Sequence, residues 1–392
     1  MNDEQSWITT PITAELLRGA IELERTERGL APLRLPAQAR AQCPDQRLLV
    51  AQAEPSGVRL VLRTRATVIE LDTVPTKKEF PGAPPRPDGV YDLLIDGDLA
   101  DSTSVAGGNV MTAELTTGSG EVRPGPTGTA RFAGLPRRDK VVEIWLPHNE
   151  LTELVALRTD APVEPVANDR PVWLHHGSSI SHGSNAASPS TIWPALAAAR
   201  GAVDLINLGF GGNALLDPFI ARALRDTPAD VISVKLGINV VNADLMRLRA
   251  FTPAVHGFLD TIREGHPSTP LLVVSAIHCP IHEDTPGPGS VDLDALRAGE
   301  LRFTATGDPA EVASGKLTLR VIRDELARVV RQRADDDANL HYLDGCELYG
   351  ETDSAELPLP DALHPDAAAH ERIGHRFADL AFGTGGPLAA HT

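Results

Sequence analysis

Cysteine and aromatic residues are scarce in this chain of 392 residues. Its three cysteines, Cys43, Cys279 and Cys346, are far apart and odd in number, which excludes a disulfide framework and a paired-cysteine zinc site and suits a reducing compartment. Aromatic residues make up 4% of the chain, so stacking platforms for bases or sugars are few. No apolar run approaches the roughly 20 residues that span a bilayer, and residues 1–6 lack the basic and apolar regions of a secretory signal. We therefore expect a cytoplasmic protein.

Positive charge is also in deficit. Lys and Arg number 36 against 53 Asp and Glu, which gives a formal net charge of −17. Nucleic acids and anionic membranes reward clustered positive charge, so we expect neither as a partner. The sequence leaves the oligomeric state open. What the chain does hold, 42% hydrophobic residues over a length suited to two domains, is enough to bury sizeable cores.

The first part of the chain is rich in short β-type segments. Turn pairs such as Pro81-Gly82 and Asp96-Gly97 separate runs of β-branched residues and leucine, a pattern typical of a β-sandwich or jelly roll. We predict such a domain over residues 1–165, with one short helix near 11–22 and a linker over 161–170. The predicted strands in this part are 48–51, 58–71, 90–95 and 141–146.

From residue 171 the pattern changes to strands that alternate with amphipathic helices. Near-continuous apolar strands indicate a parallel sheet covered on both faces, so we predict a three-layer α/β/α domain over 171–383 and a tail over 384–392. The segment 278–314 is long and rich in Pro, Gly and Asp, and a loop of this length in a compact domain is usually functional or disordered. For its first residues, 278–282, we favour a lid or pocket-wall role, and the sequence leaves open whether the whole segment is a lid. The strands are predicted at 172–175, 204–208, 231–236, 271–277 and 340–343, and the helices at 191–200, 214–225, 253–264, 315–334 and 365–382.

Four short motifs fall after these strands or in the last loop. They are Gly177-Ser178-Ser179, the run Asn207–Asn213, Gly237-Ile238-Asn239, and Asp361 with His364. In open α/β sheets, ligands bind outside the carboxyl ends of the strands. We therefore expect these motifs, which are far apart in sequence, to meet at one edge of the sheet.

Together the motifs supply the groups of a serine enzyme. A serine hydroxyl needs an adjacent base to become a nucleophile, and His364 is the candidate base for Ser179. Asp361 is placed to accept the other imidazole N–H and to stabilise the imidazolium. The backbone N–H groups of Ser179 and Gly212 and the side-chain amide of Asn239 would form an oxyanion hole, where glycine at 212 lets the main chain approach closely.

Each of these residues also has a simpler interpretation. Ser179 could be a turn or cap residue, and Ser178 is a rival hydroxyl. Asp361 could cap a helix that begins at Pro365, Gly212 could form a tight turn, and Asn239 could be a loop amide. We favour the catalytic interpretation because all the required groups occur together.

A second cluster, His278-Cys279 with His282, contains metal-ligating residue types. A proline-containing loop does not bring both histidines to one face, and no carboxylate–histidine pattern completes a site, so we expect no metal. Other polar or aromatic residues near the motifs, His175, His176 and Trp193, are expected in the packed interior.

The four motifs, in this order, resemble the four blocks of the SGNH (GDSL) hydrolase superfamily over residues 171–383. The resemblance implies a flavodoxin-like parallel sheet. It also implies Ser179 as nucleophile, Gly212 and Asn239 as oxyanion donors, and Asp361 with His364 as the rest of the triad. Two positions depart from the commonest pattern: Ser178 and Val240 stand where aspartate is usual. Neither position is catalytic in the family, so the departures argue against membership of the ordinary lipase branch and against a substrate inherited from it, and leave the triad intact.

The two-domain plan resembles a branch of this superfamily that has an N-terminal β-sandwich. The branch includes carbohydrate esterases and bacterial acyltransferases that tailor polyketides, such as those that transfer a salicylyl group in tetracycline biosynthesis. We predict an O-acyl esterase that acts on a small acylated molecule through an acyl-enzyme on Ser179, without cofactor or metal. One alternative is an acyltransferase that moves an acyl group, aromatic in the branch just named, to a hydroxyl of a polyketide-type product. An alternative of another class is a glycan-binding protein with a vestigial α/β domain.

Overall fold

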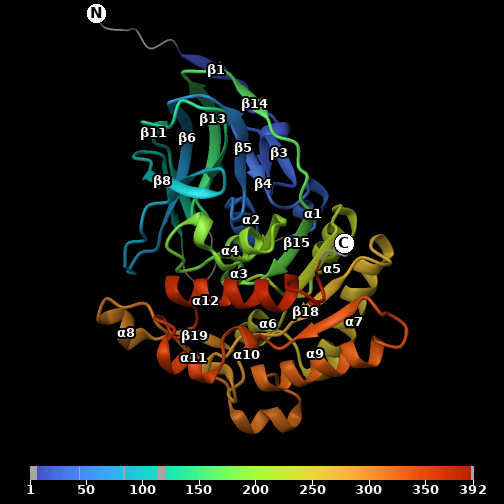
Figure 1. Cartoon of the computed structure of the whole chain (residues 1–392). Coiled ribbons are helices and arrows are strands. Elements are labelled where there is room, and N and C mark those ends of the chain that lie inside the picture. Colours follow the sequence, from blue (N-terminus) through green and yellow to red (C-terminus); the bar gives the residue numbers. More distant parts are fainter. Residues whose placement is uncertain (1–6, 44, 83, 114–119, 390–392) are drawn as a thin grey trace, which may run out of the picture.

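The computed structural model describes residues 7–389 except 44, 83 and 114–119. Two mainly antiparallel sheets, formed before residue 166, stand on a half that contains a parallel sheet and most of the helices (Figure 1). The part of the predicted tail at 390–392 lies outside the described residues. Within them, no helix is long and apolar enough to cross a membrane.

The N-terminal half is a sandwich of two sheets around its own apolar core. One sheet has the order β10-β9-β6-β13-β4-β3, with β1 on β13 and β11 on β6; the other has the order β14-β5-β12-β7-β8, with β2 on β5. All the pairings are antiparallel except β6 with β9. The strands are β1 (Ile8–Thr10), β2 (Leu17–Arg18), β3 (Glu22–Arg25), β4 (Leu30–Leu33), β5 (Arg59–Thr64), β6 (Val68–Glu79), β7 (Val90–Ile95), β8 (Asp98–Ser104), β9 (Asn109–Ala113), β10 (Gly120–Arg123), β11 (Gly128–Ala133), β12 (Lys140–Trp145), β13 (Leu151–Thr159) and β14 (Val163–Pro165).

Local sequence explains why these strands form where they do. The predicted turn at Asp96-Gly97 joins β7 to β8, and both residues have positive φ (53° and 95°), as a two-residue hairpin turn requires. Along β11, Ala130 and Phe132 are buried while their neighbours are more exposed, the alternation of a strand with one face on the core.

Four predictions for this half were wrong. The single strand predicted over 58–71 is divided between β5 and β6, with residues 65–67 outside both strands. Residues 48–51 belong to helix α2 (Gln46–Ala53), because Asp45 caps its start and Leu48 and Ala51, three residues apart, bury one face. In place of a helix near 11–22 there is only the 3₁₀ turn Ala14–Leu16, followed by β2 and β3. The predicted linker contains β14, which extends the sheet beside β5.

The second half is built on five parallel strands in the order β16-β15-β17-β18-β21. This is the flavodoxin-like order, with β15 first in sequence and second in the sheet, and it confirms the predicted fold class. The strands are β15 (Val172–Gly177), β16 (Asp204–Gly209), β17 (Val231–Lys235), β18 (Leu271–Val274) and β21 (Leu340–Leu343).

Helices cover both faces of this sheet, and the strand alternation of β15 shows which ones. Trp173 packs against Trp193 of α4 and Phe377 of α12 on one face, with ring centroids 6.1 and 5.0 Å away. His176 points to the opposite face of the sheet, where its ring centroid lies 5.9 Å from that of Phe258 of α7. The helices of this half are α3 (Ser179–His182), α4 (Trp193–Arg200), α5 (Pro218–Asp226), α6 (Ile238–Asn242), α7 (Leu248–Gly265), α8 (Leu293–Arg297), α9 (Leu319–Arg333), α10 (Gly345–Leu348), α11 (Glu351–Glu356) and α12 (Ala367–Phe377).

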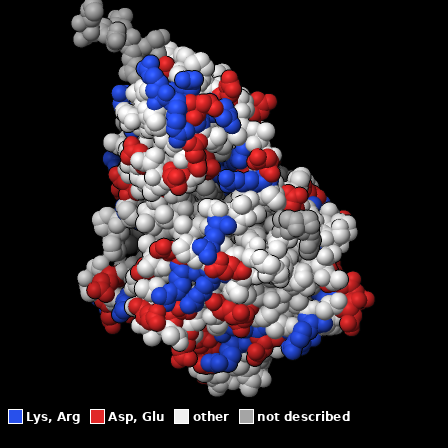
Figure 2. Space-filling model, in the orientation of Figure 1, with Lys and Arg blue, Asp and Glu red and all other residues white. Residues whose placement is uncertain are grey.

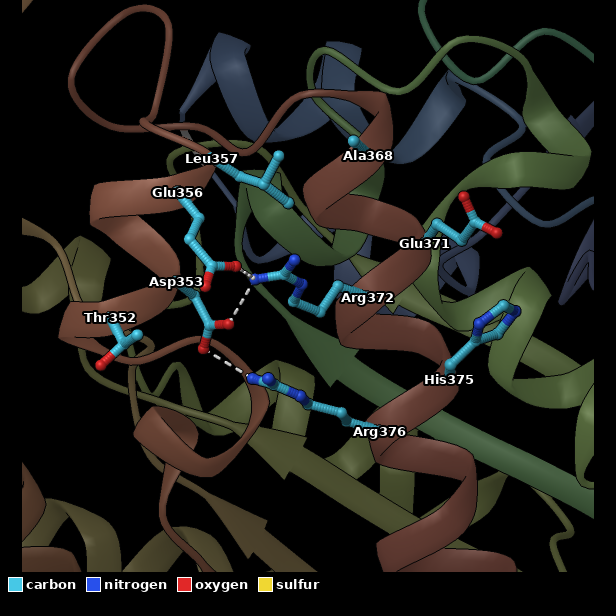
Figure 3. Close-up of a pocket in the computed structure, with 9 residues that line it drawn as sticks. All are labelled: Thr352, Asp353, Glu356, Leu357, Ala368, Glu371, Arg372, His375 and Arg376. Atoms are coloured by element: carbon cyan, nitrogen blue, oxygen red, sulfur yellow. Dashed lines mark hydrogen bonds and ion pairs between the residues drawn. The ribbon is translucent and has the colours of Figure 1, made fainter.

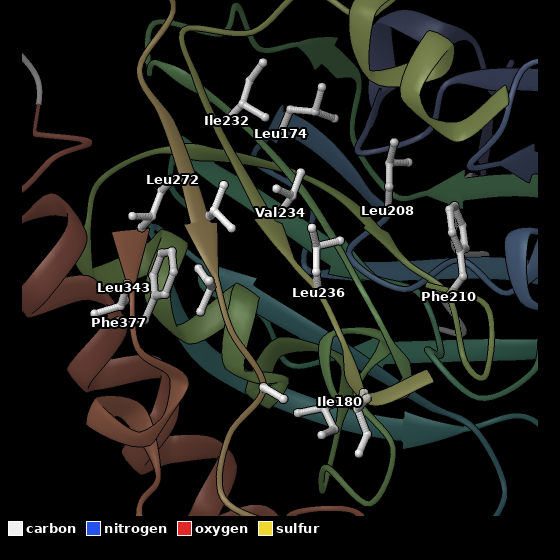
Figure 4. Close-up of a cluster of buried hydrophobic side chains, with 14 of the residues drawn as sticks. Leu174, Ile180, Leu208, Phe210, Ile232, Val234, Leu236, Leu272, Leu343 and Phe377 are labelled. Carbon is white, nitrogen blue, oxygen red and sulfur yellow. The ribbon is translucent and has the colours of Figure 1, made fainter. Parts of the chain in front are cut away.

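Apolar side chains fill much of the centre of this sheet, beside buried polar ones such as Ser233. Leu174, Ile232, Val234 and Leu272 are 0% exposed and come from three neighbouring strands (Figure 4). This burial on both faces explains why the strand predictions succeeded here. The helix predictions were right in place but not at the ends; α5, for example, begins at Pro218 instead of residue 214.

The segment 278–314 is structured rather than irregular. It forms a small hairpin from β19 (Gly289–Val291) and β20 (Phe303–Ala305), with α8 at its tip and 3₁₀ turns at Pro280–His282 and Pro309–Ser314. Elsewhere on the surface, acidic and basic side chains are intermixed on the face shown in Figure 2.

A buried carboxylate fastens α11 to α12. Asp353 accepts hydrogen bonds from Arg372 and Arg376 of α12, both at 2.6 Å, and from the N–H of Gly350 at 2.9 Å (Figure 3). Asp353, Arg372 and Arg376 border a hollow of about 620 Å³, none of whose described lining residues belongs to the predicted site. This ionic contact between α11 and α12 bears on the predicted site, because α12 begins three residues after His364.

Replacement of Asp353 by Asn should destabilise the protein in a pH-dependent way. Burial opposes ionisation of Asp353, but the bonds from Arg376, Gly350 and Arg372 outweigh it and lower its pKa to about 2. The carboxylate therefore stabilises the fold fully above the ordinary pKa of about 3.9, and this contribution is lost as the pH falls toward 2. We expect the variant to lose about 1–2 kcal/mol at pH 7 in urea unfolding. The difference from wild type should shrink between about pH 5 and pH 2; a constant difference would contradict this role.

Candidate active site

Ser179 lies at the turn between β15 and α3. Ser178 precedes the helix and its Oγ accepts from the N–H of Ile180 (3.4 Å), while Gly183, at φ 107°, ends the helix after one turn. Ser179 is the first residue of α3, so its N–H has no carbonyl partner within the helix. The turn therefore presents both a hydroxyl and a backbone donor at the carboxyl edge of the sheet. The rival Ser178 is occupied as a cap.

The structure brings Ser179, His364 and Asp361 together in one chain of hydrogen bonds. Ser179 Oγ lies 2.8 Å from His364 Nε2, and His364 Nδ1 lies 2.7 Å from Asp361 Oδ2. Because an ionised carboxylate can only accept, Nδ1–H donates to Asp361 and leaves Nε2 to accept from the serine hydroxyl. This is the tautomer that base catalysis on serine needs.

Asp361 is held in place by its own turn. Its Oδ1 accepts from the N–H groups of Leu363 (2.9 Å) and His364 (2.7 Å). Burial opposes ionisation, but the hydrogen bond and charge of His364 and these two N–H groups outweigh it, so the pKa of Asp361 lies below its ordinary value. The carboxylate is thus charged at neutral pH and can stabilise an imidazolium. The helix-cap alternative is wrong, because α12 begins at Ala367 and its cap is Asp366.

The second motif lies directly against the serine. A Cβ built on Gly211 would be 3.8 Å from Ser179 Cβ, so the loop of Gly211 and Gly212 lies beside this serine. Gly212 has φ 73°, and a Cβ there would meet no described atom within 4 Å. The left-handed backbone accounts for glycine at 212, and the close approach of the main chain to an oxyanion stays a prediction.

Asn239, the second residue of α6, is tied to the same loop. Its Oδ1 accepts from the N–H of Ala214 at 3.0 Å, and the residue is 3% exposed. Since the oxygen is used in this way, the amide orientation leaves the two N–H groups of Nδ2 as donors. Asn239 thus offers the donor that an oxyanion hole needs, beside the loop that carries Gly212.

Two residues beside the triad were missed by the sequence analysis. Asn185, with φ 66°, donates from Nδ2 to Asp361 Oδ2 at 3.2 Å. Phe303 of β20 donates its N–H to the carbonyl of Asp361 (2.9 Å), and its half-buried ring stands edge-on to that of His364, with centroids 5.7 Å apart. Neither residue belongs to a periodic or spaced motif. The one advance signal was the length of segment 278–314, which contains Phe303 and which the sequence marked as functional or disordered.

The other histidines near the motifs are part of the interior. His175 is 0% exposed and bonds Ser233 Oγ (2.7 Å) and Ser181 Oγ (2.8 Å) through its two ring nitrogens. Burial holds its pKa well below the ordinary value, so the ring is neutral. In the second cluster, His282 is buried and bonds the carbonyl of Thr285 (3.1 Å), while His278 lies 3.4 Å from Glu283.

Comparison with known proteins places both halves of the chain. Residues 176–372 match the GDSL-like lipase/acylhydrolase family, and residues 16–155 match the SsfX3 N-terminal domain. The structure is similar to the salicylyl-acyltransferase SsfX3 from a tetracycline biosynthetic pathway, with 30% identity, 95% of each chain covered and a TM-score of 0.76. No curated protein matches the sequence.

More distant structures share the fold. A family two carbohydrate esterase from Clostridium thermocellum aligns with 12% identity over 85% of this chain and 94% of its own, at a TM-score of 0.56. An acetyl xylan esterase from Butyrivibrio proteoclasticus aligns with 10% identity over 98% and 99%, at 0.53. The order of the parallel strands, the family match over half of the chain and the similarity along its whole length lead to one assignment: the chain belongs to the GDSL-like lipase/acylhydrolase family.

Proposed function

We propose that the protein transfers acyl groups from small-molecule esters to a hydroxyl acceptor through an acyl-enzyme on Ser179. The observation that carries the proposal is the continuous hydrogen-bonded chain from Ser179 through His364 to Asp361. The chemistry needs neither metal nor organic cofactor, because the base, the nucleophile and the oxyanion donors are all supplied by the protein.

In the first half-reaction, Ser179 Oγ attacks the ester carbonyl carbon and its proton passes to His364 Nε2. Asp361 stays ionised and stabilises the imidazolium. The N–H groups of Ser179, Gly212 and Asn239 Nδ2 meet the oxyanion. Collapse of the tetrahedral intermediate breaks the ester C–O bond, and the leaving alcohol takes the proton from His364.

The second half-reaction repeats these roles with the acceptor. His364 removes the proton of the incoming hydroxyl as its oxygen attacks the acyl carbon, and the proton then returns to Ser179 as the acyl–enzyme bond breaks. An alcohol and water can both serve, and exclusion of water decides between them.

Transfer to an alcohol is the first candidate because the similarity to a salicylyl-acyltransferase extends over 95% of both chains. The aromatic ring of Phe303 beside His364 offers an apolar contact suited to an aromatic acyl group or acceptor. Hydrolysis, which the sequence analysis placed first, is the second candidate, because the same site cleaves the acyl-enzyme whenever water reaches it. The glycan-binding alternative loses its support, since the family is one of enzymes.

Covalent labelling tests the nucleophile. Intact-mass spectrometry after treatment with a fluorophosphonate should show one adduct on the wild type and none on Ser179→Ala, because Ser179 is hydrogen-bonded to a histidine that Asp361 orients. Ser181 and Ser233, which bond the buried His175, are 0% exposed and should not react. The matched control is Ser178→Ala, which removes the neighbouring hydroxyl and should still be labelled. Persistence of the adduct in folded Ser179→Ala, or its loss in folded Ser178→Ala, would contradict the assignment.

The ratio of ester product to free acid tests whether an alcohol or water accepts the acyl group. With p-nitrophenyl benzoate as donor and benzyl alcohol added in water, we expect benzyl benzoate to form in an amount that rises with alcohol concentration, and Ser179→Ala to form none. Formation of benzoate alone at every alcohol concentration would favour the esterase over the transferase.

A further inference from the structure

Arg34, from the N-terminal half, lies buried beneath the catalytic loops of the other half. It follows β4 and is 0% exposed. Its guanidinium contacts five groups: the carbonyls of Glu54 (2.6 Å), Ala51 (2.5 Å), Asn207 (2.9 Å) and Gly209 (2.7 Å), and Nδ1 of His182 (3.2 Å).

Three of these contacts reach the two segments that build the site. His182 is the last residue of α3, the helix that Ser179 begins. Asn207 and Gly209 end β16, immediately before the loop that carries Gly212. The guanidinium carbon also lies 4.9 Å from the ring centroid of Phe210, the next residue of that loop. One side chain therefore joins the nucleophile helix to the oxyanion loop.

The contacts of Arg34 are not those expected of a residue that only holds the two halves of the chain together. Within the described residues, Arg34 forms no salt bridge, and its donors go to carbonyl oxygens and one ring nitrogen. Burial lowers its pKa to about 9, so the group remains a cation at neutral pH. A buried cation without an ion pair is costly, whereas a planar fork of donors fixes several acceptors at defined positions.

Other contacts between the halves reinforce the same helix. Ser56 donates from Oγ to the carbonyl of His182 (2.6 Å), and Asn207 Nδ2 donates to the carbonyl of Ser181 (2.9 Å) and to Ser56 Oγ (3.0 Å). The end of α3 is thus held by the N-terminal half and by β16 at once.

We propose that Arg34 is a positioning residue for acyl transfer, which fixes the oxyanion loop at Gly209–Gly212 relative to Ser179. This inference rests on the proposed function. It assigns to the N-terminal half a direct part in the geometry of the transition state, through a residue that touches no reacting atom.

The chain contains its own control for this idea. Arg59 of β5 is also a buried arginine (5% exposed) that crosses to β16, where it pairs with Asp204 and donates to the carbonyl of Leu205 (3.3 Å). Arg59 thus contacts the start of β16, whereas Arg34 contacts its end. Both arginines are buried cations that contact β16. They differ in where along β16 they bind relative to Ser179, and Arg59 forms salt bridges whereas Arg34, within the described residues, forms none.

The test compares Arg34→Lys with Arg59→Lys in steady-state hydrolysis of p-nitrophenyl acetate and in the rate of fluorophosphonate labelling. Lysine keeps the charge but cannot hold several carbonyls in one plane. We expect Arg34→Lys to lower kcat by about 10–100-fold and to slow labelling by a similar factor, with KM nearly unchanged, because displacement of an oxyanion donor affects the transition state. Arg59→Lys should lower the unfolding temperature and leave kcat within about 2-fold of wild type.

Unchanged kcat and labelling in folded Arg34→Lys would overturn the proposal, as would equal losses in both variants, which indicate general loosening. If Arg34→Lys does not fold, Ser56→Ala replaces it, and we expect a smaller loss of kcat, about 3–10-fold, at constant KM; no loss would overturn the proposal. A wild type that is neither labelled nor active would instead contradict the proposed function.

Discussion

The position of β15 in the interior of the parallel sheet, between two other strands, is the constraint on which the rest of the structure depends. It pairs with β16 on one side and β17 on the other, and Gly177 at its end lies opposite Gly209. Both of its faces are packed, with Trp173 against α4 and α12 and His176 against α7. A strand held in this way cannot shift its register without exposing apolar side chains, so the turn that follows places Ser179 at a defined point. The loops after the neighbouring strands then bring the remaining donors to the same edge.

The N-terminal half acts on the segment that follows this strand at both of its ends. Arg34 and Ser56 contact His182 at the end of α3. Further along, the buried carboxylate of Asp92 in β7 accepts from the hydroxyls of Ser188 and Ser190. Between these anchor points lies Asn185, which bonds Asp361. The N-terminal half is therefore part of the framework that positions Ser179 and Asp361.

The fold of the second half and the juxtaposed residues could be predicted because their signals are local. Buried parallel strands are near-continuous apolar runs, and the motifs follow those strands directly. The errors have physical reasons. The four apolar residues at 48–51 suit a strand or a helix equally, and the cap at Asp45 decides the outcome. Asn185, Phe303 and Arg34 could not be found, because each acts through contacts between positions far apart in sequence, and no periodicity marks them.

The central claim is that acyl groups pass through a covalent bond to Ser179. The most direct measurement is mass spectrometry of the protein quenched during turnover of p-nitrophenyl benzoate, followed by peptide mapping. The account predicts one benzoyl group on the peptide that contains Ser179, which disappears when the donor is exhausted. Turnover at full rate with no acylated protein, or with the acyl group on a different residue, would contradict it.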